Sequence, residues 1–307
     1  MHISNKLFGK SEWITNGKQE PDSPRRAPVF LKDFSIQKPV SKVQIFISAL
    51  GLFEAQLNGR PVSNDLFAPG FTNYERRIGY RAYDITNLVQ NQNKLVITVG
   101  EGWYRGPFRG GKPRDNYGDQ AGLIAKLVIR YSDGSIQKIV TDQNWHYIYG
   151  PIKYSEFYGG ELYDANISKN NEKPVQMLDH SKATLYPETK PPVRRHETFP
   201  CKVIRTEVDG SLILDFKQNL AGWVQLNLKG RKGDTIKIEH TEVLDKDGNI
   251  YTGNLRDAKA TDKYVLNGIQ RIYEPHFTYH GFRMPGSAGS GTARLSIFHL
   301  KNGQQKG

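Results

Sequence analysis

Short runs in which hydrophobic and polar residues alternate recur along this chain of 307 residues. In residues 43–50, Val43, Ile45 and Ile47 alternate with other residues, which is the period of a β-strand that buries one face. Further runs of this kind lie at 52–57, 94–100, 123–131, 135–141 and 145–149, and then at 211–216, 222–228, 234–239, 264–266 and 273–282. Helical periodicity longer than about ten residues is absent from the pattern. The pattern therefore predicts an all-β protein.

Turn residues and prolines divide these runs into two sets. Asn58-Gly59 and Asp133-Gly134 each separate two runs and predict β-hairpins. Residues 168–192 are polar and contain four prolines, which is typical of a linker. Two sets of short strands on either side of a Pro-rich linker predict two β-sandwich domains of jelly-roll type.

The linker sets the expected domain boundaries. The first sandwich is predicted at 29–188 and the second at 189–284. Residues 1–28 are polar and carry three prolines, so we expect an extended lead-in without a fold of its own.

The most unusual stretch of the chain is GEGWYRGPFRGGKPRDNYGD, at residues 100–119. Its glycines and prolines break both strand and helix periods, and they predict a long surface loop. Aromatic rings beside carboxylate and amide oxygens suit a sugar, because a ring covers the apolar face of a pyranose. The candidate residues are Trp103, Tyr104, Arg105, Asp115, Asn116 and Tyr117. The alternative is an ordinary connection in which Trp103 and Tyr104 tuck under the sheet.

A second glycine-containing segment has similar chemistry. EFYGGELYDAN, at residues 156–166, supplies Glu161, Tyr163 and Asp164. If both loops rise from the same end of one sheet, they form a single site. We therefore predict that the two segments converge at one edge of the first sandwich.

Charge and composition limit the classes of function. The chain carries 43 Lys and Arg against 31 Asp and Glu, a net charge of +12, which favours polyanionic surroundings. It has no run of five basic residues, so a nucleic-acid arm is not expected. Cys201 is the single cysteine, which excludes an intrachain disulfide. Neither a signal peptide nor a membrane span is visible, so the default expectation is a cytoplasmic protein, or an exported one if a signal was removed.

Two histidines of the second half have the spacing of metal ligands on a helix, and a third lies beside a glutamate. His276 and His280 are four residues apart in a stretch that reads as strand, which would separate them by about 13 Å. We interpret both as core or surface residues. His240 shares a strand face with Glu242, for which a structural role is favoured over a role in an interface.

Several segments, taken in order, resemble a known family. They are LGLFEAQLNGRPV, LFAPGFTNYERRIGYRAYDIT, GEGWYRG, NYGD, FYGGELYDA, DFKQNLAGWVQLNLKG, IEHTEVLDKDGNIYTGNLRDAKATDKYVL and YEPHFTYHGFR. In this order they are similar to two successive non-catalytic sandwiches of the bacterial α-L-rhamnosidases of glycoside hydrolase family 78. The resemblance covers roughly Trp13 to Arg283.

The resemblance implies a site in the first sandwich. That domain looks like a family 67 carbohydrate-binding module, which holds L-rhamnose through a bound calcium ion. Asp115 and Asn116 match its calcium and sugar ligands, and Asp164 is a third expected metal ligand. Trp103, Tyr104, Glu161 and Tyr163 fall beside them by order. Calcium takes six to eight oxygen ligands, which carboxylate, amide and backbone carbonyl groups supply.

Two departures from the family pattern matter. Lys217 stands where the family's segment normally has Gly. After Arg283 the likeness ends, and residues 285–307 form a Gly- and Ser-rich tail that we expect to be unrelated to the family. The family's catalytic carboxylates sit on a helical barrel to which no residue here corresponds, so no independent hydrolysis is expected.

Three functions remain as hypotheses. The first is a calcium-dependent module that binds rhamnose-containing glycans or glycosides. The second is an inactive rhamnosidase fragment with two structural sandwiches. The third is a polyanion-binding protein that uses its positive charge. Acidic pectic polymers, which carry rhamnose and uronic acids, would combine the first hypothesis with the charge.

Overall fold

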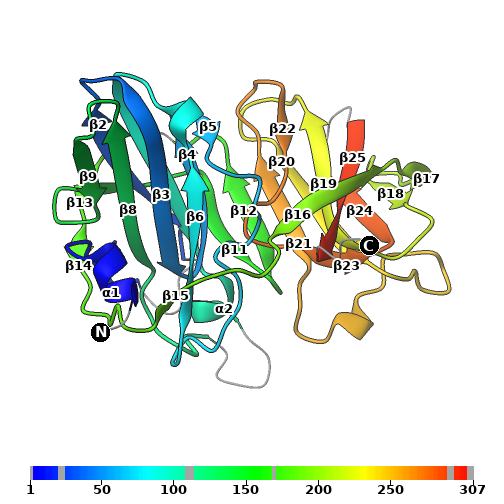
Figure 1. Ribbon diagram of the computed structural model, residues 1–307. Coiled ribbons are helices and arrows are strands. Elements are labelled where there is room, and N and C mark those ends of the chain that lie inside the picture. Colours follow the sequence, from blue (N-terminus) through cyan, green and yellow to red (C-terminus); the bar gives the residue numbers. More distant parts are fainter. Residues whose placement is uncertain (1–2, 20–24, 108–113, 168–170, 289–293, 303–307) are drawn as a thin grey trace, which may run out of the picture. The chain divides into compact units, whose positions relative to one another are not determined.

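The chain folds as two compact units (Figure 1). The computed structural model describes residues 3–19, 25–107, 114–167, 171–288 and 294–302. The first unit comprises Met1–Ser23, Ala27–Tyr149 and Lys169–Val193, and the second comprises Pro24–Arg26, Gly150–Ser168 and Arg194–Gly307. Among the described residues, no helix has the length and apolar character needed to cross a bilayer.

The first unit is a sandwich of two sheets, as the alternating pattern predicts. Among the described residues one sheet has the order β14 (Gln176–Met177), β1 (Ile14–Thr15), β8 (Gly122–Tyr131), β3 (Val40–Leu50), β6 (Ile78–Asp84), β15 (Leu185–Pro187), with β9 (Ile136–Val140) also paired to β8. The other has the order β13 (Lys173–Pro174), β10 (His146–Tyr149), β2 (Pro28–Ser35), β7 (Gln92–Gly100), β4 (Leu52–Leu57), β5 (Arg60–Pro61). The strand pairs are antiparallel except that of β15 with β6.

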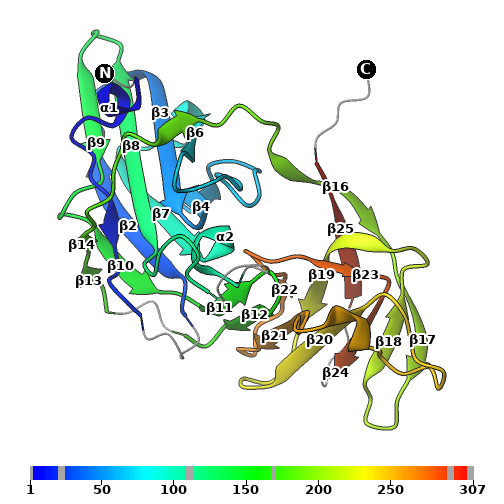
Figure 2. The ribbon, with the colours of Figure 1, turned by 90° about the horizontal axis from the view of Figure 1, so that it is seen from below.

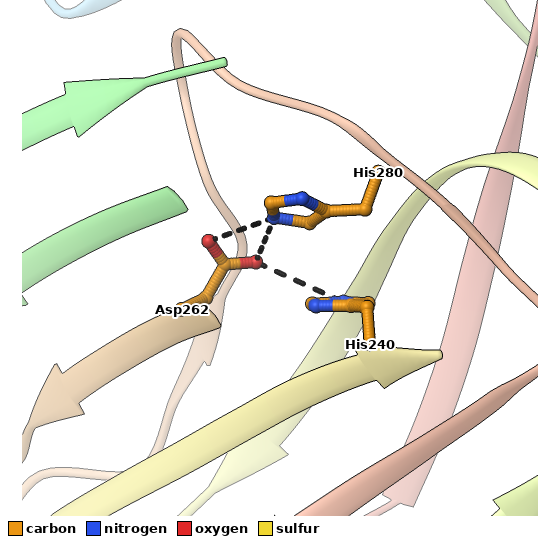
Figure 3. A group of neighbouring side chains, drawn as sticks. All are labelled: His240, Asp262 and His280. Atoms are coloured by element: carbon orange, nitrogen blue, oxygen red, sulfur yellow. Dashed lines mark hydrogen bonds and ion pairs between the residues drawn. The ribbon is translucent and has the colours of Figure 1, made fainter. Parts of the chain in front are cut away.

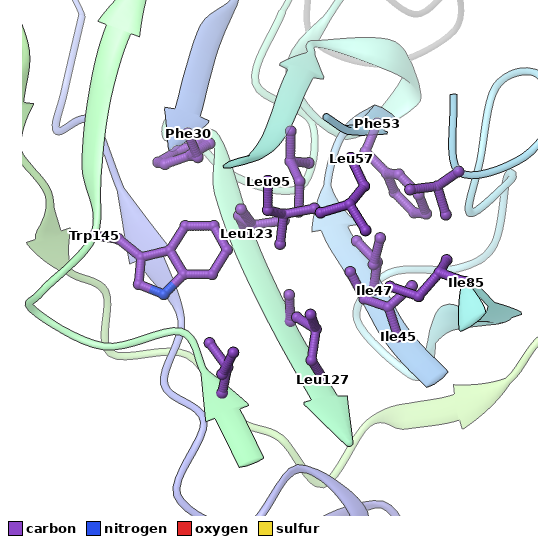
Figure 4. Close-up of a cluster of buried hydrophobic side chains, with 14 of the residues drawn as sticks. Phe30, Ile45, Ile47, Phe53, Leu57, Ile85, Leu95, Leu123, Leu127 and Trp145 are labelled. Atoms are coloured by element: carbon purple, nitrogen blue, oxygen red, sulfur yellow. The ribbon is translucent and has the colours of Figure 1, made fainter. Parts of the chain in front are cut away.

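The core of this unit lies between the two sheets (Figure 4). Ile45 of β3 faces Leu127 of β8 across the ladder, and both side chains are fully buried. Trp145 closes one end of the cluster, and its indole N–H donates to the carbonyl of Val140 at 2.8 Å. Replacing such a side chain by Ala typically costs about 3–5 kcal/mol, so this core accounts for the cohesion of the unit.

The predicted hairpins are present. Asn58 and Gly59 both have positive φ, at 54° and 77°, and they connect β4 to β5. This is the conformation for which Asn-Gly is favoured in two-residue hairpin loops. Asp133 and Gly134 connect β8 to β9, where the Asp133 carboxylate accepts from the Ser135 amide at 2.9 Å.

Two segments that were expected to be an extended lead-in and a linker contribute secondary structure to the sandwich. The predicted lead-in instead contains helix α1 (Ile3–Phe8) and strand β1, which pairs with β8. The predicted Pro-rich linker supplies β13, β14 and β15 to the edges of both sheets. Val175 and Leu185 are buried there, so these residues fold with the first unit because they cover its apolar surface.

The second unit also contains two sheets (Figure 2). In the described part of the chain the larger has the order β11 (Ile152–Glu156), β12 (Gly160–Asp164), β21 (Thr261–Val265), β20 (Thr235–Thr241), β24 (Met284–Ala288), β18 (Leu212–Asp215), β17 (Lys202–Thr206). The smaller has the order β16 (Val193–Phe199), β25 (Arg294–Asn302), β19 (Leu220–Leu228), β22 (Arg271–Tyr273), with β23 (His280–Phe282) also paired to β19. Trp223, Ile238 and Phe277 are among the buried hydrophobic residues of this unit.

The segment at residues 156–166 is not a loop of the first sandwich. It is part of the β11–β12 hairpin, and β12 pairs in parallel with β21 of the second unit. The predicted boundary at 188 is therefore wrong for residues 150–168, which belong to the second unit. The chain leaves the first unit after Tyr149 and returns to it at Lys169. These residues were assigned to the first domain because they precede the predicted linker. The strand with which β12 pairs, β21, lies about a hundred residues further along the chain.

The C-terminal residues are likewise part of the fold. Instead of a separate tail, β24 pairs with β20 and β18, and β25 pairs with β19. The Gly- and Ser-rich stretch 289–293 and residues 303–307 lie outside the described residues. Strand residues at 284–288 were missed because MPGSA contains Gly, Pro and Ser, which lower strand propensity.

The departure at Lys217 has a conformational explanation. Its φ is 64°, in the left-handed region, and its amide donates to the Asp215 carboxylate at 2.7 Å. Glycine adopts this conformation without a steric penalty, which explains why a glycine suits this position in related sequences.

Gly160 tests the assignment of the β11–β12 hairpin to the second unit. Its φ is 90°, and a Cβ there would lie 2.0 Å from the Thr261 carbonyl oxygen on the neighbouring strand. We expect Gly160→Ala to destabilise the protein by at least about 2 kcal/mol, because backbone atoms must move apart. Urea unfolding measures the loss, and hydrogen exchange localises it to β12 and β21.

Gly159→Ala is the matched control. There a Cβ would meet only the flexible Glu156 side chain at 3.2 Å. Its effect should stay within about 1 kcal/mol. Equal effects of the two substitutions would contradict the pairing of β12 with β21.

Candidate functional site

A second apolar cluster covers the outer face of the β3–β8 sheet in the first unit. Phe46 of β3 and Ile124 of β8 point to this face, because they alternate with the inward-facing Ile45, Ile47 and Ala125. The buried members of the cluster are Phe8, Trp13, Leu50, Tyr74, Ile78, Tyr80, Tyr104, Ile124 and Leu185. Trp103 and Tyr117 pack against it and are half-buried. The candidate loop therefore lies over this sheet face.

The loop begins with a buried ionic anchor. Helix α2 (Gly102–Arg105) follows Glu101, whose side chain is 6% exposed. Arg105 donates to this carboxylate at 2.8 Å, and Arg114 donates to its other oxygen. Because a buried carboxylate needs such partners, these bonds hold both ends of the loop together. Arg105 is 1% exposed, so it supports the site and was wrongly predicted as a sugar contact.

Main-chain hydrogen bonds return the loop to α2. The Asp115 amide donates to the Arg105 carbonyl at 3.0 Å, and the Tyr117 amide donates to the Tyr104 carbonyl at 3.2 Å. Gly118 permits this close approach, since a Cβ there would lie 2.4 Å from the Tyr104 hydroxyl. The loop thus has two described arms, residues 101–107 and 114–119. Residues 108–113, between these arms, lie outside the described residues.

The aromatic rings of the loop divide into a buried and an accessible set. Tyr104 is 5% exposed, stacks on Tyr117 with ring centres 6.3 Å apart, and meets Tyr74 edge-on. Burial, with the nearby charge of Asp119 adding to it, raises the pKa of Tyr104 to about 12. Its hydroxyl is therefore neutral at physiological pH. The expectation of an exposed Trp-Tyr pair is wrong for Tyr104, which tucks under as in the alternative interpretation.

The accessible set consists of Phe71, Trp103 and Tyr117, which we call the aromatic wall. Phe71 is 44% exposed and meets Trp103 edge-on at 5.7 Å. Trp103 and Tyr117 are half-buried, so part of each ring surface remains open. Of the three aromatic residues predicted in this loop, the structure thus keeps Trp103 and Tyr117 accessible, and it adds Phe71, which the sequence pattern did not single out.

Asp115 and Asn116 directly precede Tyr117 of this wall in the chain. Asp115 has φ 58°, and both residues are half-buried. A carboxylate, an amide carbonyl and neighbouring main-chain carbonyls are oxygen donors of the kind that calcium prefers. The donor chemistry therefore fits part of a calcium coordination sphere. Asp119, four residues later, pairs with Lys18 at 2.8 Å, and this hydrogen bond lowers the pKa of Asp119.

The other predicted site residues belong to the second unit. Glu161, Tyr163 and Asp164 lie on β12. Asp164 accepts from the amide and the side chain of Asn166, at 3.0 and 3.1 Å. The prediction that both segments belong to the first sandwich is therefore corrected: Asp115 and Asn116 lie in the first unit, whereas Asp164 lies in the second.

Glu161 has an internal structural partner. It is completely buried, and its carboxylate accepts from the His276 amide at 2.8 Å and pairs with His276 Nδ1 at 3.0 Å. The His276 ring stacks on Tyr163, with centres 5.7 Å apart and planes 4° apart. These contacts fasten the β11–β12 hairpin to the second unit and leave Glu161 no open face for a sugar.

A buried polar cluster in the second unit was not predicted. His240 on β20, Asp262 on β21 and His280 on β23 point toward one another (Figure 3). One nitrogen or oxygen atom from each residue lies within 4.8 Å of the others. The three residues are 0%, 1% and 4% exposed. Since β20 and β21 belong to one sheet and β23 pairs with the other, the cluster connects both sheets of the unit.

Hydrogen bonds determine which ring nitrogens carry protons. His280 Nε2 lies 3.2 Å from both Asp262 carboxylate oxygens and donates to them. His240 Nδ1 donates to the Ala260 carbonyl at 2.9 Å, because a carbonyl can only accept. Burial, with the charge of His280 adding to it, lowers the pKa of His240 to about 3, so its ring is neutral. Burial by itself would raise the pKa of Asp262, but His280, His240 and the Glu161 amide together outweigh burial, so the pKa is lowered.

The sequence carried little signal for this cluster. His240 and Asp262 lie diagonally across the β20–β21 ladder, where Ile238 pairs with Asp262 and His240 with Ala260. His280 comes from a separate strand. One sequence feature could have indicated the cluster. His240 and Asp262 stand at strand positions that face inward, where apolar residues are usual.

Both units match known sequence families. The α-L-rhamnosidase N-terminal domain matches residues 38–197, which is more than half of the chain. The concanavalin-like domain of bacterial α-L-rhamnosidases matches residues 205–284. The chain belongs to the α-L-rhamnosidases of glycoside hydrolase family 78, as the sequence resemblance implied.

Individual relatives agree with this assignment. The α-L-rhamnosidase of Streptomyces avermitilis is 37% identical over 289 residues, covering 85% of this chain and 27% of that protein. Its crystal structure, a complex with L-rhamnose, has a TM-score of 0.84 at 34% identity and covers 90% of this chain and 29% of that chain. The Aspergillus terreus enzyme has a TM-score of 0.89 at 34% identity and covers 96% of this chain and 36% of that chain. The present chain thus spans about a third of the length of these relatives.

The corrected role of Glu161 can be tested by Glu161→Gln. The substitution removes the negative charge that pairs with His276, and we expect a loss of about 1–3 kcal/mol in the free energy of unfolding. Glu242→Gln, at an exposed position, makes the same chemical change and should stay within about 0.5 kcal/mol. Urea unfolding of the two variants measures the difference. Equal stabilities would contradict the structural role of Glu161.

Proposed function

We propose that the first unit is a calcium-dependent binding module for terminal L-rhamnosyl groups. The observation that carries the proposal is the return of Asp115 and Asn116 to α2, which sets an oxygen-donor pair beside the aromatic wall. Membership of the α-L-rhamnosidase family supports the choice of sugar, as does the structure of the Streptomyces avermitilis relative with L-rhamnose.

Each part of the site has a distinct role in this proposal. The open ring surfaces of Trp103 and Tyr117 cover the apolar face of the sugar, as aromatic groups do in polar clefts. Asp115 and Asn116 hold the calcium ion, which when bound supplies coordination positions for sugar hydroxyl groups. Tyr104 and Arg105 support the site without contacting the sugar. Both are buried under the loop, and their contacts hold its two arms in place.

The proposed role is binding without hydrolysis by the residues described. Glycosidases need two carboxyl groups facing each other across the scissile bond, about 5–9.5 Å apart. The buried carboxylates Glu101, Glu161 and Asp262 are each engaged by arginine or histidine. In the part of the chain that the structure describes, the α-helices are α1 and α2, which are six and four residues long, so no helical barrel is present.

Calcium dependence can be tested by titrating L-rhamnose into the chain with calcium and with a chelator. Asp115→Ala should weaken binding at least about tenfold, because it removes a charged ligand worth more than about 1.4 kcal/mol. Calorimetry measures the affinity. In the wild-type chain the chelator should have the same effect as the substitution.

Asp133→Ala is the control for the loss of one carboxylate. Asp133 lies in an exposed turn of the same unit and pairs with Lys38. Its affinity for L-rhamnose should equal that of the wild type. Binding that survives both the chelator and Asp115→Ala would overturn the proposal.

The net charge of +12 extends the proposal to the type of glycan. A basic protein associates more strongly with acidic rhamnose-bearing polymers, such as pectic glycans, than with neutral rhamnosides. We expect the affinity for the acidic polymer to fall on raising the salt concentration from 50 to about 300 mM, because the charges are screened. A neutral rhamnoside should bind equally at both concentrations. A salt-independent affinity for the acidic glycan would contradict this extension.

A further inference from the structure

The His240–Asp262–His280 cluster contains an unsatisfied buried atom. His240 Nε2 points toward the Asp262 carboxylate but is 3.9 Å from its nearest oxygen, and it has no hydrogen-bond partner among the described residues. Since Nδ1 donates to Ala260, Nε2 presents a lone pair to the interior of the cluster. Leaving a buried acceptor unpaired costs about 1–3 kcal/mol, so its position calls for a ligand.

The spacing of the three residues suits a small metal ion. A tetrahedral ion with bonds of about 2.0–2.1 Å has ligand atoms about 3.3 Å apart. His280 Nε2 and the Asp262 oxygens are 3.2 Å apart, and His240 Nε2 is 3.9 Å from Asp262. All three ligand atoms lie within 4.8 Å of one another, and the His240 and His280 rings stack with centres 4.1 Å apart. Metal binding would therefore require the His240 ring to move by up to about 1.5 Å to complete three ligand positions.

The groups around the cluster have the arrangement expected of metal ligands. A ligating histidine usually donates its second nitrogen to a carbonyl or carboxylate, as His240 does to Ala260. A ligating carboxylate is usually hydrogen-bonded as well, and the Glu161 amide donates to Asp262 at 2.9 Å. These bonds orient both side chains before any ion binds.

We propose that His240, Asp262 and His280 form a structural site for a divalent transition-metal ion of the zinc type. Two imidazole nitrogens and one carboxylate favour zinc and its neighbours over calcium or magnesium, which prefer oxygen ligands. For His280 Nε2 to bind the ion as a neutral imidazole, the ring must keep one proton on Nδ1. The Nε2 proton therefore moves to Nδ1, or it leaves to solvent if both nitrogens were protonated. The ion joins strands from both sheets of the second unit. All three ligands of this ion belong to the second unit, so the proposed metal site shares no ligand with the calcium site proposed for the first unit.

Burial of the cluster determines how the experiment is done. Because the ligands are at most 4% exposed, an ion enters during folding or opening of the unit and not by simple diffusion. The full chain, without a histidine tag, is unfolded in urea with a chelator and refolded in the presence of zinc or cobalt(II). After removal of excess metal, the bound ion is counted by mass spectrometry, and cobalt is read from its visible absorption.

The expected result is about one zinc ion per chain and the intense visible bands of tetrahedral cobalt. The melting temperature should rise when the chain is refolded with zinc, because the metal binds the folded state. His240→Asn and Asp262→Asn should each lose the bound ion and the zinc-dependent rise in melting temperature.

His196→Asn is the matched control, since His196 lies at an exposed position of the same unit, outside the cluster. It should retain the ion and the cobalt spectrum. A refolded wild-type chain with neither zinc nor a tetrahedral cobalt spectrum would overturn the proposal, whatever the variants do. Metal that remains in His240→Asn and Asp262→Asn but is lost from His196→Asn would also overturn it. Both measurements are made without sugar, so their failure leaves the rhamnose proposal untouched.

Discussion

The first unit depends on one constraint, which is that its larger sheet must be covered on both faces. Strand β8 is buried at six consecutive positions from Gly122 to Leu127. A strand in a simple sandwich has one buried face, so such a run requires a second layer. One face packs on the other sheet, and the opposite face is covered by Phe8, Trp13, Tyr74 and Tyr104. The helix, the first strand and the candidate loop are held in place by this second layer.

The candidate site is a consequence of that outer layer. Tyr104 and Arg105 are buried beneath the loop, where the tyrosine joins the aromatic cluster and the arginine neutralises Glu101. The loop can then present Trp103 and Tyr117 at the surface without losing its anchor. A rigid support under a short binding segment reduces the conformational entropy that the segment loses when a ligand binds, and this favours affinity.

Buried polar groups play the corresponding role in the second unit. The Asp262 carboxylate accepts hydrogen bonds from His280 Nε2 and from the Glu161 amide, while the Glu161 carboxylate accepts from the His276 amide. Each of these contacts joins segments that are far apart in sequence. Because an unpaired buried charge is costly, the β11–β12 hairpin is tied to this unit although its neighbours in sequence belong to the other. Because this hairpin belongs to the second unit but lies in sequence between two segments of the first, the two units are not consecutive segments of the chain.

The local patterns of the chain were sufficient to predict its all-β class, most strand positions, both hairpins and the rhamnosidase family. Those features depend on neighbouring residues: alternation such as Val43, Ile45 and Ile47, the positive φ of Asn58-Gly59, and the order of motifs. The burial of Tyr104, the transfer of residues 150–168 to the second unit and the meeting of His240, Asp262 and His280 were decided by the tertiary structure. Tyr104 is buried by rings from other segments, such as Tyr74. The other two features depend on pairing between strands that are distant in sequence, and period-2 alternation does not encode which strand a strand will join.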